Sequence, residues 1–474
     1  MNLWRPAAVG GAVVALGAGL GLAGDPGGAP ELPAKLGESA VLLQRQIAAG
    51  SRAFEHVASL TTEVGPRLAG SDGDRRAVEW ALGKLRELGF ANVHAEPVTV
   101  PRWIRGDAAA EILAPWPQPL VLAALGGSVG TPQVGLAGEV VEAANVAALE
   151  ALPDETVRGR IVFLSERMRR AIDGAGYGKT VPNRAGGAVA AAKKGAIALI
   201  IRSVGTDSHR FPHTGSLHYA AEVPRIPAAA LANPDADLLA AQVASGRPVR
   251  LALRLGCRDA GEAESANVLG EVVGRDRPQE VVVLGAHLDS WDLGTGALDD
   301  GAGIGVVIEA ARQIARLAER PSRTLRVVLF ANEEYGLSGA KGYVAAHAGE
   351  LDRHVAALES DLGSGRIHRF RAHVAPADAG WVPALHRLLV PLGIPFDESP
   401  AGGGADIGQL RKAGVAVFDL SPDASDYFDF HHTADDTLDK VDRAALDQAV
   451  AAHATLALAL ADLPVKLARV PVSE

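Results

Sequence analysis

One histidine and several aspartates crowd the loop that follows a short apolar run near the middle of the chain. Residues 281–284, "VVVL", have the composition of a buried strand. "GAHLDSWDLGTGALDDGAG" follows, with His287 and Asp289 at the strand end and Asp299 and Asp300 in a glycine-rich loop before a helix. Carboxylates packed this closely repel one another and cannot all stay ionised in a dry cleft. The stretch therefore predicts a site that holds a cation.

Three further strand ends carry side chains of the same kinds. Glu333 and Glu334 end the strand in "TLRVVLFANEE", and Asp361 ends the strand in "HVAALESD". His431 and His432 follow the last strand, in "FHHTADDT". Because ligands of open α/β sheets bind at the carboxyl ends of strands, we expect these side chains to meet at one rim of a sheet.

The donor set indicates which metal such a rim would hold. Histidine nitrogen and carboxylate oxygen without sulfur favour zinc and, less specifically, manganese or cobalt. One carboxylate shared by two ions would set them about 3.5–4 Å apart, the spacing of hydrolytic two-metal sites. Each motif alone has an ordinary explanation, such as a turn, a helix cap or a solvated face. Their occurrence together at successive strand ends favours the metal site.

The elements that would position these residues form an α/β pattern. From Ser265 onward, apolar strands alternate with helices of 3.6-residue periodicity, which predicts a mixed, mostly parallel sheet flanked by helices. Residues 106–262 instead contain short strands and turns, including "GRIVFLS" and "AIALII", which predict a β-rich insert. The expected organisation is an N-terminal part of the main domain at 25–105, the insert at 106–262, and the rest of the main domain at 263–474.

Composition and the N-terminus restrict location and partners. The net charge of −10 argues against nucleic acid as a partner, and the single cysteine, Cys257, rules out an intrachain disulfide. Residues 1–24 contain Arg5 followed by an apolar, glycine-rich stretch, which predicts a signal peptide or an uncleaved anchor. We therefore expect a secreted or periplasmic protein with no other contact with the membrane.

Several motifs together resemble a known family. "HLDSWDLGTGALDDGAG", "ANEEYGLSGA", "ESDLGSG" and "HHTADDT" are similar to the co-catalytic zinc peptidases of metallopeptidase family 28, the aminopeptidase Y type of clan MH. "EVGPRLAGS", "EPVTVPRW" and "IIRSVGTDSHRFPHTGSLHY" resemble its carboxypeptidase Q (plasma glutamate carboxypeptidase) branch. The resemblance covers nearly everything after about residue 40. It implies a zinc exopeptidase fold, with an insert similar to a protease-associated domain.

The resemblance implies two Zn²⁺ ions per chain and a role for each residue of the rim. Asp406, in "GGGADIGQLRKAGVAV", and His431 are candidate substrate contacts, although Asp406 has an alternative interpretation as a helix N-cap and His431 is the rival of His432 as a ligand. The implied roles are His287 and Asp361 on one zinc, Glu334 and His432 on the other, Asp299 bridging both, Glu333 as general base and Asp289 orienting the ring of His287.

The implied activity is hydrolysis of peptide bonds in short peptides, as by a dipeptidase or aminopeptidase, through a metal-activated water with Glu333 as base. Relatives also imply a homodimer. Two alternatives remain open. A glutaminyl-peptide cyclotransferase shares the fold but uses one zinc and a tryptophan-lined pocket, for which Trp291 is a candidate. A non-catalytic ectodomain of the same fold would have lost metal ligands. The number of metal ions per chain distinguishes these functions: two for the peptidase, one for the cyclotransferase and none for the non-catalytic ectodomain.

Overall fold

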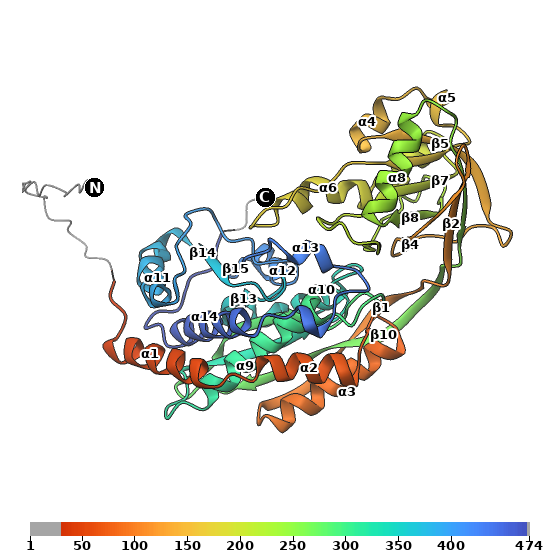
Figure 1. Ribbon diagram of the computed structural model, residues 1–474. Coiled ribbons are helices and arrows are strands. Elements are labelled where there is room, and N and C mark those ends of the chain that lie inside the picture. The colour runs from red at the N-terminus through yellow and green to blue at the C-terminus, as the bar shows by residue number, and fades with distance from the viewer. Residues whose placement is uncertain (1–29, 472–474) are drawn as a thin grey trace, which may run out of the picture.

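The computed structural model describes residues 30–471, and the predicted signal peptide or anchor at 1–24 lies outside the described residues. Within that range the chain forms a seven-stranded sheet and an eight-stranded sheet, each with its own helices. Figure 1 shows the two sheets as separate layers connected by long strands.

The seven-stranded sheet is built from the two ends of the chain. Its strands are β1 (Ala91–Ile104), β10 (Arg258–Val272), β11 (Arg277–His287), β12 (Arg323–Phe330), β13 (His354–Glu359), β14 (Ile367–His373) and β15 (Val417–Pro422). They lie in the order β1-β10-β12-β11-β13-β15-β14. Neighbours from β12 to β15 are parallel, whereas β10 and β14 run antiparallel to their neighbours. The predicted mixed, mostly parallel sheet is therefore confirmed.

Helices cover both faces of this sheet. They are α1 (Ala34–Ala49), α2 (Ala53–Glu63), α3 (Asp72–Glu87), α9 (Ala302–Ala315), α10 (Ser338–Ala346), α11 (Val382–Leu389), α12 (Ile407–Lys412), α13 (Tyr427–Phe430) and α14 (Arg443–Ala461), with single turns η1 (Ala297–Gly301), η2 (Ala348–Arg353), η3 (Pro376–Trp381), η4 (Val390–Leu392) and η5 (Leu438–Lys440). Alternate residues of β11 point to opposite faces. Val282 and Leu284 join the core with α9 and α14, whereas Val281 and Val283 join the core with α10 and α12. The apolar run "VVVL" thus serves both layers at once.

By length and composition, helix α14 is apolar enough to cross a bilayer. However, 89% of its most apolar window is buried inside the protein. It packs on α9 and α1, so its apolar character is that of a core helix.

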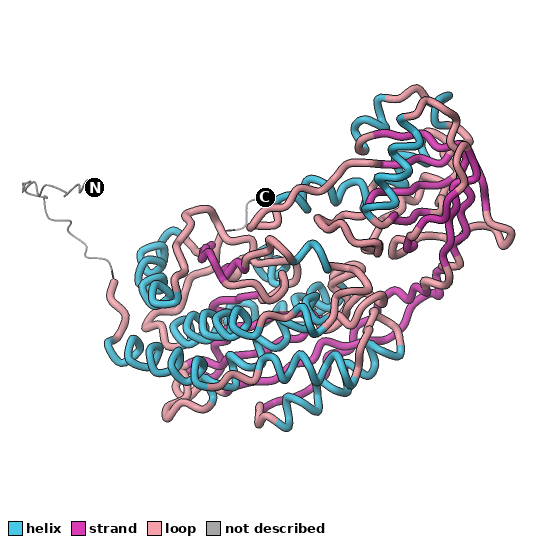
Figure 2. The backbone as a smooth tube through the Cα atoms, in the orientation of Figure 1, coloured by secondary structure: helices cyan, strands magenta, loops and turns pink. Residues whose placement is uncertain are grey.

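The eight-stranded sheet lies wholly between β1 and β10. Its strands are β2 (Ala108–Ala114), β3 (Gln118–Leu120), β4 (Leu122–Ala124), β5 (Leu136–Ala143), β6 (Ile161–Leu164), β7 (Ala198–Arg202), β8 (Ala228–Leu231) and β9 (Arg250–Leu255). Its helices are α4 (Val146–Ala151), α5 (Asp154–Val157), α6 (Ala175–Ala185), α7 (Gly187–Lys193) and α8 (Asn233–Ala244). We call residues 106–257 the insert. We call the seven-stranded sheet the core sheet. Figure 2 shows β1 and β10 as a two-stranded ribbon that leads from the core sheet to the insert.

Candidate metal centre

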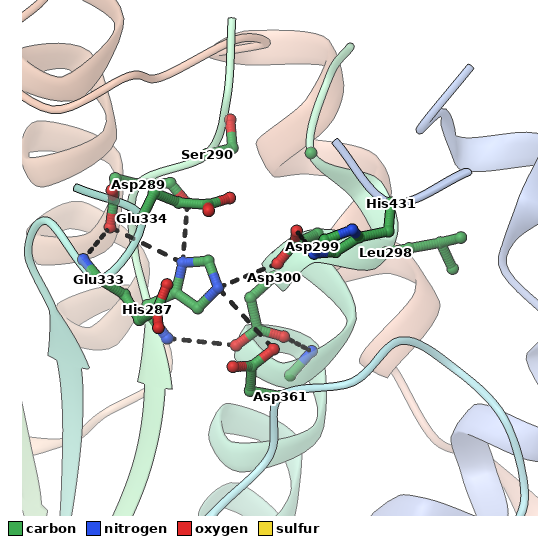
Figure 3. A network of polar contacts seen from close by, with 12 residues as sticks. His287, Asp289, Ser290, Leu298, Asp299, Asp300, Glu333, Glu334, Asp361 and His431 are labelled. Atoms are coloured by element: carbon green, nitrogen blue, oxygen red, sulfur yellow. Dashed lines mark hydrogen bonds and ion pairs between the residues drawn. The ribbon is translucent and has the colours of Figure 1, made fainter. Parts of the chain in front are cut away.

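His287 ends β11 at the carboxyl edge of the core sheet and is 1% exposed. Its Nδ1 lies 3.1 Å from the backbone carbonyl of Asp289 and 3.7 Å from the carboxylate of the same residue. A proton on Nδ1 therefore donates to Asp289 and leaves Nε2 free as a ligand. Nε2 lies 3.1 Å from Asp299 and 3.9 Å from Asp361 (Figure 3). One potential ligand atom from each of His287, Asp299 and Asp361 lies within 4.8 Å of the other two.

Asp299 is the centre of the arrangement, because its two oxygens face different neighbours. Oδ1 faces His287, whereas Oδ2 lies 3.2 Å from Nε2 of His432. The same Nε2 lies 2.8 Å from Glu334. Two sets of nitrogen and oxygen donors therefore meet at one carboxylate. The peptide between Asp299 and Asp300 is cis.

The two neighbouring histidines differ in their distances to the acidic groups. His431 stacks on His432 with ring centroids 3.5 Å apart, and its Nε2 lies 3.6 Å from Asp299. His432 contacts both Asp299 and Glu334 more closely, which favours it as the ligand. His431 lies in the same cluster and faces the cavity.

Burial and like charges raise the pKa of three acids around this point. Burial, reinforced by neighbouring acids that include Asp361, raises the pKa of Glu333 and Glu334 well above the usual value. Burial also raises the pKa of Asp361 to about 6. Burial would lower the pKa of His287, but its contacts with Asp289 and Asp299 raise it well above the ordinary value. Such a cluster is unfavourable without a cation, so the residues fit a divalent metal.

Glu333 and Glu334 follow β12 and take different positions. Glu334 faces His432, whereas Glu333 lines the cavity without contacting either histidine in the described structure. The backbone N–H of Glu333 donates to Oδ1 of Asp289 at 2.9 Å. Asp289 therefore holds both His287 and the start of the loop that carries the two glutamates.

Two residues that support the loop after β11, Arg67 and Asp436, were not recognised from the sequence, and a third, Asp300, was named there without a role. Buried Arg67 donates to the carbonyls of Leu288, Thr295 and Gly296, which shapes residues 288–296. Asp436 accepts from the N–H groups of Leu298 and Asp299, at 2.6 and 3.2 Å. Asp300 accepts from the N–H of His287 at 3.1 Å. Arg67 lies in the motif "EVGPRLAGS" and Asp436 in "HHTADDT". Their position inside these motifs was the only feature of the sequence that could have identified them.

The insert supplies one wall of the site. The N–H of Thr214 donates to the carbonyl of His432 at 3.0 Å, and Nδ1 of His432 lies 3.3 Å from the carbonyl of Thr214. Nδ1 of His213 donates to the carbonyl of His431 at 2.7 Å, and its Nε2 lies 3.1 Å from Asp207. His432 has a left-handed φ of 62° that non-glycine residues seldom adopt, and these contacts hold it there.

A cavity of about 470 Å³ opens between the insert and the core sheet. This volume falls within the range of small-molecule sites. Its lining combines residues of both parts: Tyr177, Arg184, Ser216, His218, Asp299, Glu333, Glu334, Gly336, Leu337, Lys341, Asp361, Leu362, Ala405, Tyr427, Phe428, His431 and His432.

Two candidate residues lie behind this lining. Asp406 is 1% exposed, and its carboxylate makes no hydrogen bond to any residue within 30–471. It stands at the N-cap position of α12, as the alternative interpretation expected, but its side chain makes no cap hydrogen bond. Burial, Glu359 and Glu333 raise the pKa of Asp406 well above its usual value. Trp291 is 4% exposed and packs against the ring of His432, outside the cavity lining.

The fold and the paired donor sets define a metallopeptidase of the α/β class. Residues 267–457 match Peptidase family M28, and the chain belongs to this family. It is 36% identical over 421 residues to carboxypeptidase Q of Xenopus laevis, which covers 89% of this chain and 88% of that one. Human carboxypeptidase Q is 35% identical over the same length.

Solved structures agree with the family assignment at high identity and with the fold at lower identity. A Peptidase M28 precursor from Shewanella amazonensis is 46% identical, with a TM-score of 0.91 over 92% of this chain and 99% of that one. A zinc aminopeptidase from Bacillus subtilis shares the fold at 20% identity, with a TM-score of 0.63 over 85% and 93% of the two chains.

Proposed function

We propose that the chain is a di-zinc exopeptidase of short peptides, and one observation carries the proposal. The two oxygens of Asp299 face two separate donor sets, at 3.1 Å from His287 and 3.2 Å from His432. In the proposal, His287 and Asp361 hold one Zn²⁺, Glu334 and His432 hold the other, and Asp299 bridges them. This donor set of nitrogen and oxygen suits zinc.

Zinc bound by these residues would lower the pKa of a water toward about 7 and would polarise the scissile carbonyl. Glu333 faces the cavity and is positioned to take the proton of the attacking water and return it to the leaving amine. Asp289 orients His287 and fixes the backbone of Glu333, so it aligns a ligand and the base together. The burial of Asp406 behind Ala405 leaves it outside this proposal as a direct substrate contact.

Replacement of the base separates catalysis from metal binding. We expect Glu333→Gln to keep two zinc ions per chain and to lose about 10²–10⁴-fold in kcat, the usual contribution of a general base. The matched control is Asp299→Asn, which should lose both metal and activity because both ions share that ligand. Zinc content by atomic emission and hydrolysis of Ala-Ala measure the two effects. Wild-type turnover in Glu333→Gln would contradict the assignment of the base.

The alternatives lose support on specific observations. The tryptophan expected to line a cyclotransferase pocket, Trp291, is outside the cavity lining. All five proposed ligands and the general base lie together, so the site has not lost the groups that a non-catalytic ectodomain would lack. A measured stoichiometry of one zinc per chain would restore the cyclotransferase alternative.

The proposal includes a location outside the cytoplasm. It is supported by the signal-like composition of residues 1–24. Fractionation of the native host with a C-terminal tag tests it, and recovery of the protein in the cytoplasm would contradict it.

A further inference from the structure

A buried cation faces the acidic cavity from the side of the insert. Arg184, on α6, is 6% exposed and lines the cavity. Its Nη2 donates to the hydroxyl of Tyr177 at 2.7 Å, and its Nε donates to the carbonyl of Ser216 at 3.3 Å. Nη1 lies 3.4 Å from Nδ1 of His432. Among residues 30–471, Arg184 forms no ion pair with a carboxylate, so a buried charge remains without an anionic partner.

The surrounding residues hold the guanidinium in this position. The ring centroid of Tyr177 lies 5.4 Å from its central carbon. Gly215 passes so close that a Cβ there would lie 2.3 Å from Nη1 of Arg184, so the glycine leaves the space that the guanidinium occupies. Burying a charge without a counter-ion is unfavourable, and this one also stands beside a residue that would bind Zn²⁺. An anionic group of the substrate would supply the missing counter-ion of Arg184 and would reduce its repulsion from the zinc.

The cavity has charges of opposite sign on different parts of its lining. The cations Arg184 and Lys341 come from the insert and from α10, whereas the acids Glu333 and Asp361 follow strands of the core sheet. A short peptide carries an amine at one end and a carboxylate at the other. In a dipeptide the terminal carboxylate lies only one residue length, roughly 3.5 Å, from the scissile bond.

We propose that Arg184 is a specificity-determining residue that binds a carboxylate of the peptide on the leaving-group side of the scissile bond. The guanidinium fork matches a carboxylate with two parallel hydrogen bonds. The inference rests on the proposed peptidase function and names the group that the site selects. The carboxylate comes from the C-terminus or from an acidic side chain next to it.

Three substrates separate these sources. Ala-Ala has a free C-terminal carboxylate, Ala-Ala-NH₂ has none, and Ala-Glu-NH₂ has only a side-chain carboxylate. We expect the zinc-loaded wild-type protein to cleave Ala-Ala about 10- to 100-fold faster than its amide in kcat/KM, as expected for a charged hydrogen bond. Faster cleavage of Ala-Glu-NH₂ than of Ala-Ala-NH₂ would assign the side chain as the source.

The variants test whether Arg184 causes this preference. Arg184→Gln should lose the preference for Ala-Ala over Ala-Ala-NH₂, measured as the ratio of the two kcat/KM values, and Arg184→Lys should keep part of it. The matched control, Arg167→Gln, makes the same change at an exposed arginine of the insert that pairs with Asp237, and it should keep the full preference. Zinc content and melting temperature are measured for each variant.

Other outcomes overturn the inference. Equal cleavage of Ala-Ala and its amide by the wild type would do so without any variant. Equal slowing of both substrates in Arg184→Gln would give Arg184 a role at the reacting carbonyl or in folding instead. If Arg184→Gln does not fold, a wild-type preference that is unchanged in Arg184→Lys also refutes it. Failure of the wild type to cleave all three peptides would refute the proposed function itself.

Discussion

Replacement of His213 by alanine should weaken zinc binding although this residue is no ligand. The ring is 1% exposed, donates to the carbonyl of His431 at 2.7 Å and contacts Asp207 at 3.1 Å. Loss of the ring leaves the carbonyl of His431 unsatisfied at a cost of about 1–3 kcal/mol. If this cost falls on the loop that presents His432, zinc affinity at that position decreases about 5- to 150-fold.

Competition between the protein and a chromophoric chelator for zinc measures this effect. The control is Arg170→Ala, because Arg170 also joins the insert to the ligand loop, through Asp426 and Asp429, but its side chain is 42% exposed. Exposed ion pairs contribute about 0–1 kcal/mol, so the control should change zinc affinity little. Undiminished zinc affinity in His213→Ala, together with a lower melting temperature, would show that His213 stabilises only the insert and would refute the reasoning.

Three further outcomes are expected. Asp436→Asn disturbs the acceptor that holds the N–H groups of Leu298 and Asp299, so zinc affinity should fall about 10- to 100-fold in the same competition assay; an unchanged affinity would show that the loop keeps its shape without this carboxylate. Burial opposes the ionisation of Glu309, but hydrogen bonds led by that of Arg312 outweigh it and lower the pKa from 4.5 to about 2. The resulting stabilisation, about 3 kcal/mol, is complete above pH 4.5 and is lost as the pH falls toward 2, and urea unfolding of Glu309→Gln should lack this component. Removal of zinc by a chelator should abolish activity and lower the melting temperature, because ligand at 100 times its Kd stabilises a protein by about 2.7 kcal/mol per site; an unchanged melting temperature after verified metal removal would contradict a metal role in stability.

The parts of the site that were predictable lie at strand ends. His287, Glu334 and Asp361 each follow an apolar strand, and parallel strands deliver their carboxyl ends to one edge. The position of these residues therefore follows from local patterns and a general rule of sheet topology. The core sheet itself was predicted from the alternation of apolar strands with helices, which is also a local pattern.

The residues that escaped prediction act across large separations in the chain. Arg67 contacts carbonyls more than 220 positions away, and Arg184 lies 248 positions from His432. No local periodicity records such contacts. Trp291 and Asp406 were suggested by their residue types near the site, and the structure buries both side chains outside the cavity lining.

The ribbon of β1 and β10 also has an evolutionary consequence. Ile104 pairs with Arg258, so the chain leaves the core sheet and returns to it at neighbouring positions. A module whose ends meet in this way can be lengthened, shortened or exchanged without reordering the strands that carry the ligands. The cavity residues supplied by the insert, which would select the substrate, can therefore change in evolution independently of the residues of the core sheet that would carry out hydrolysis.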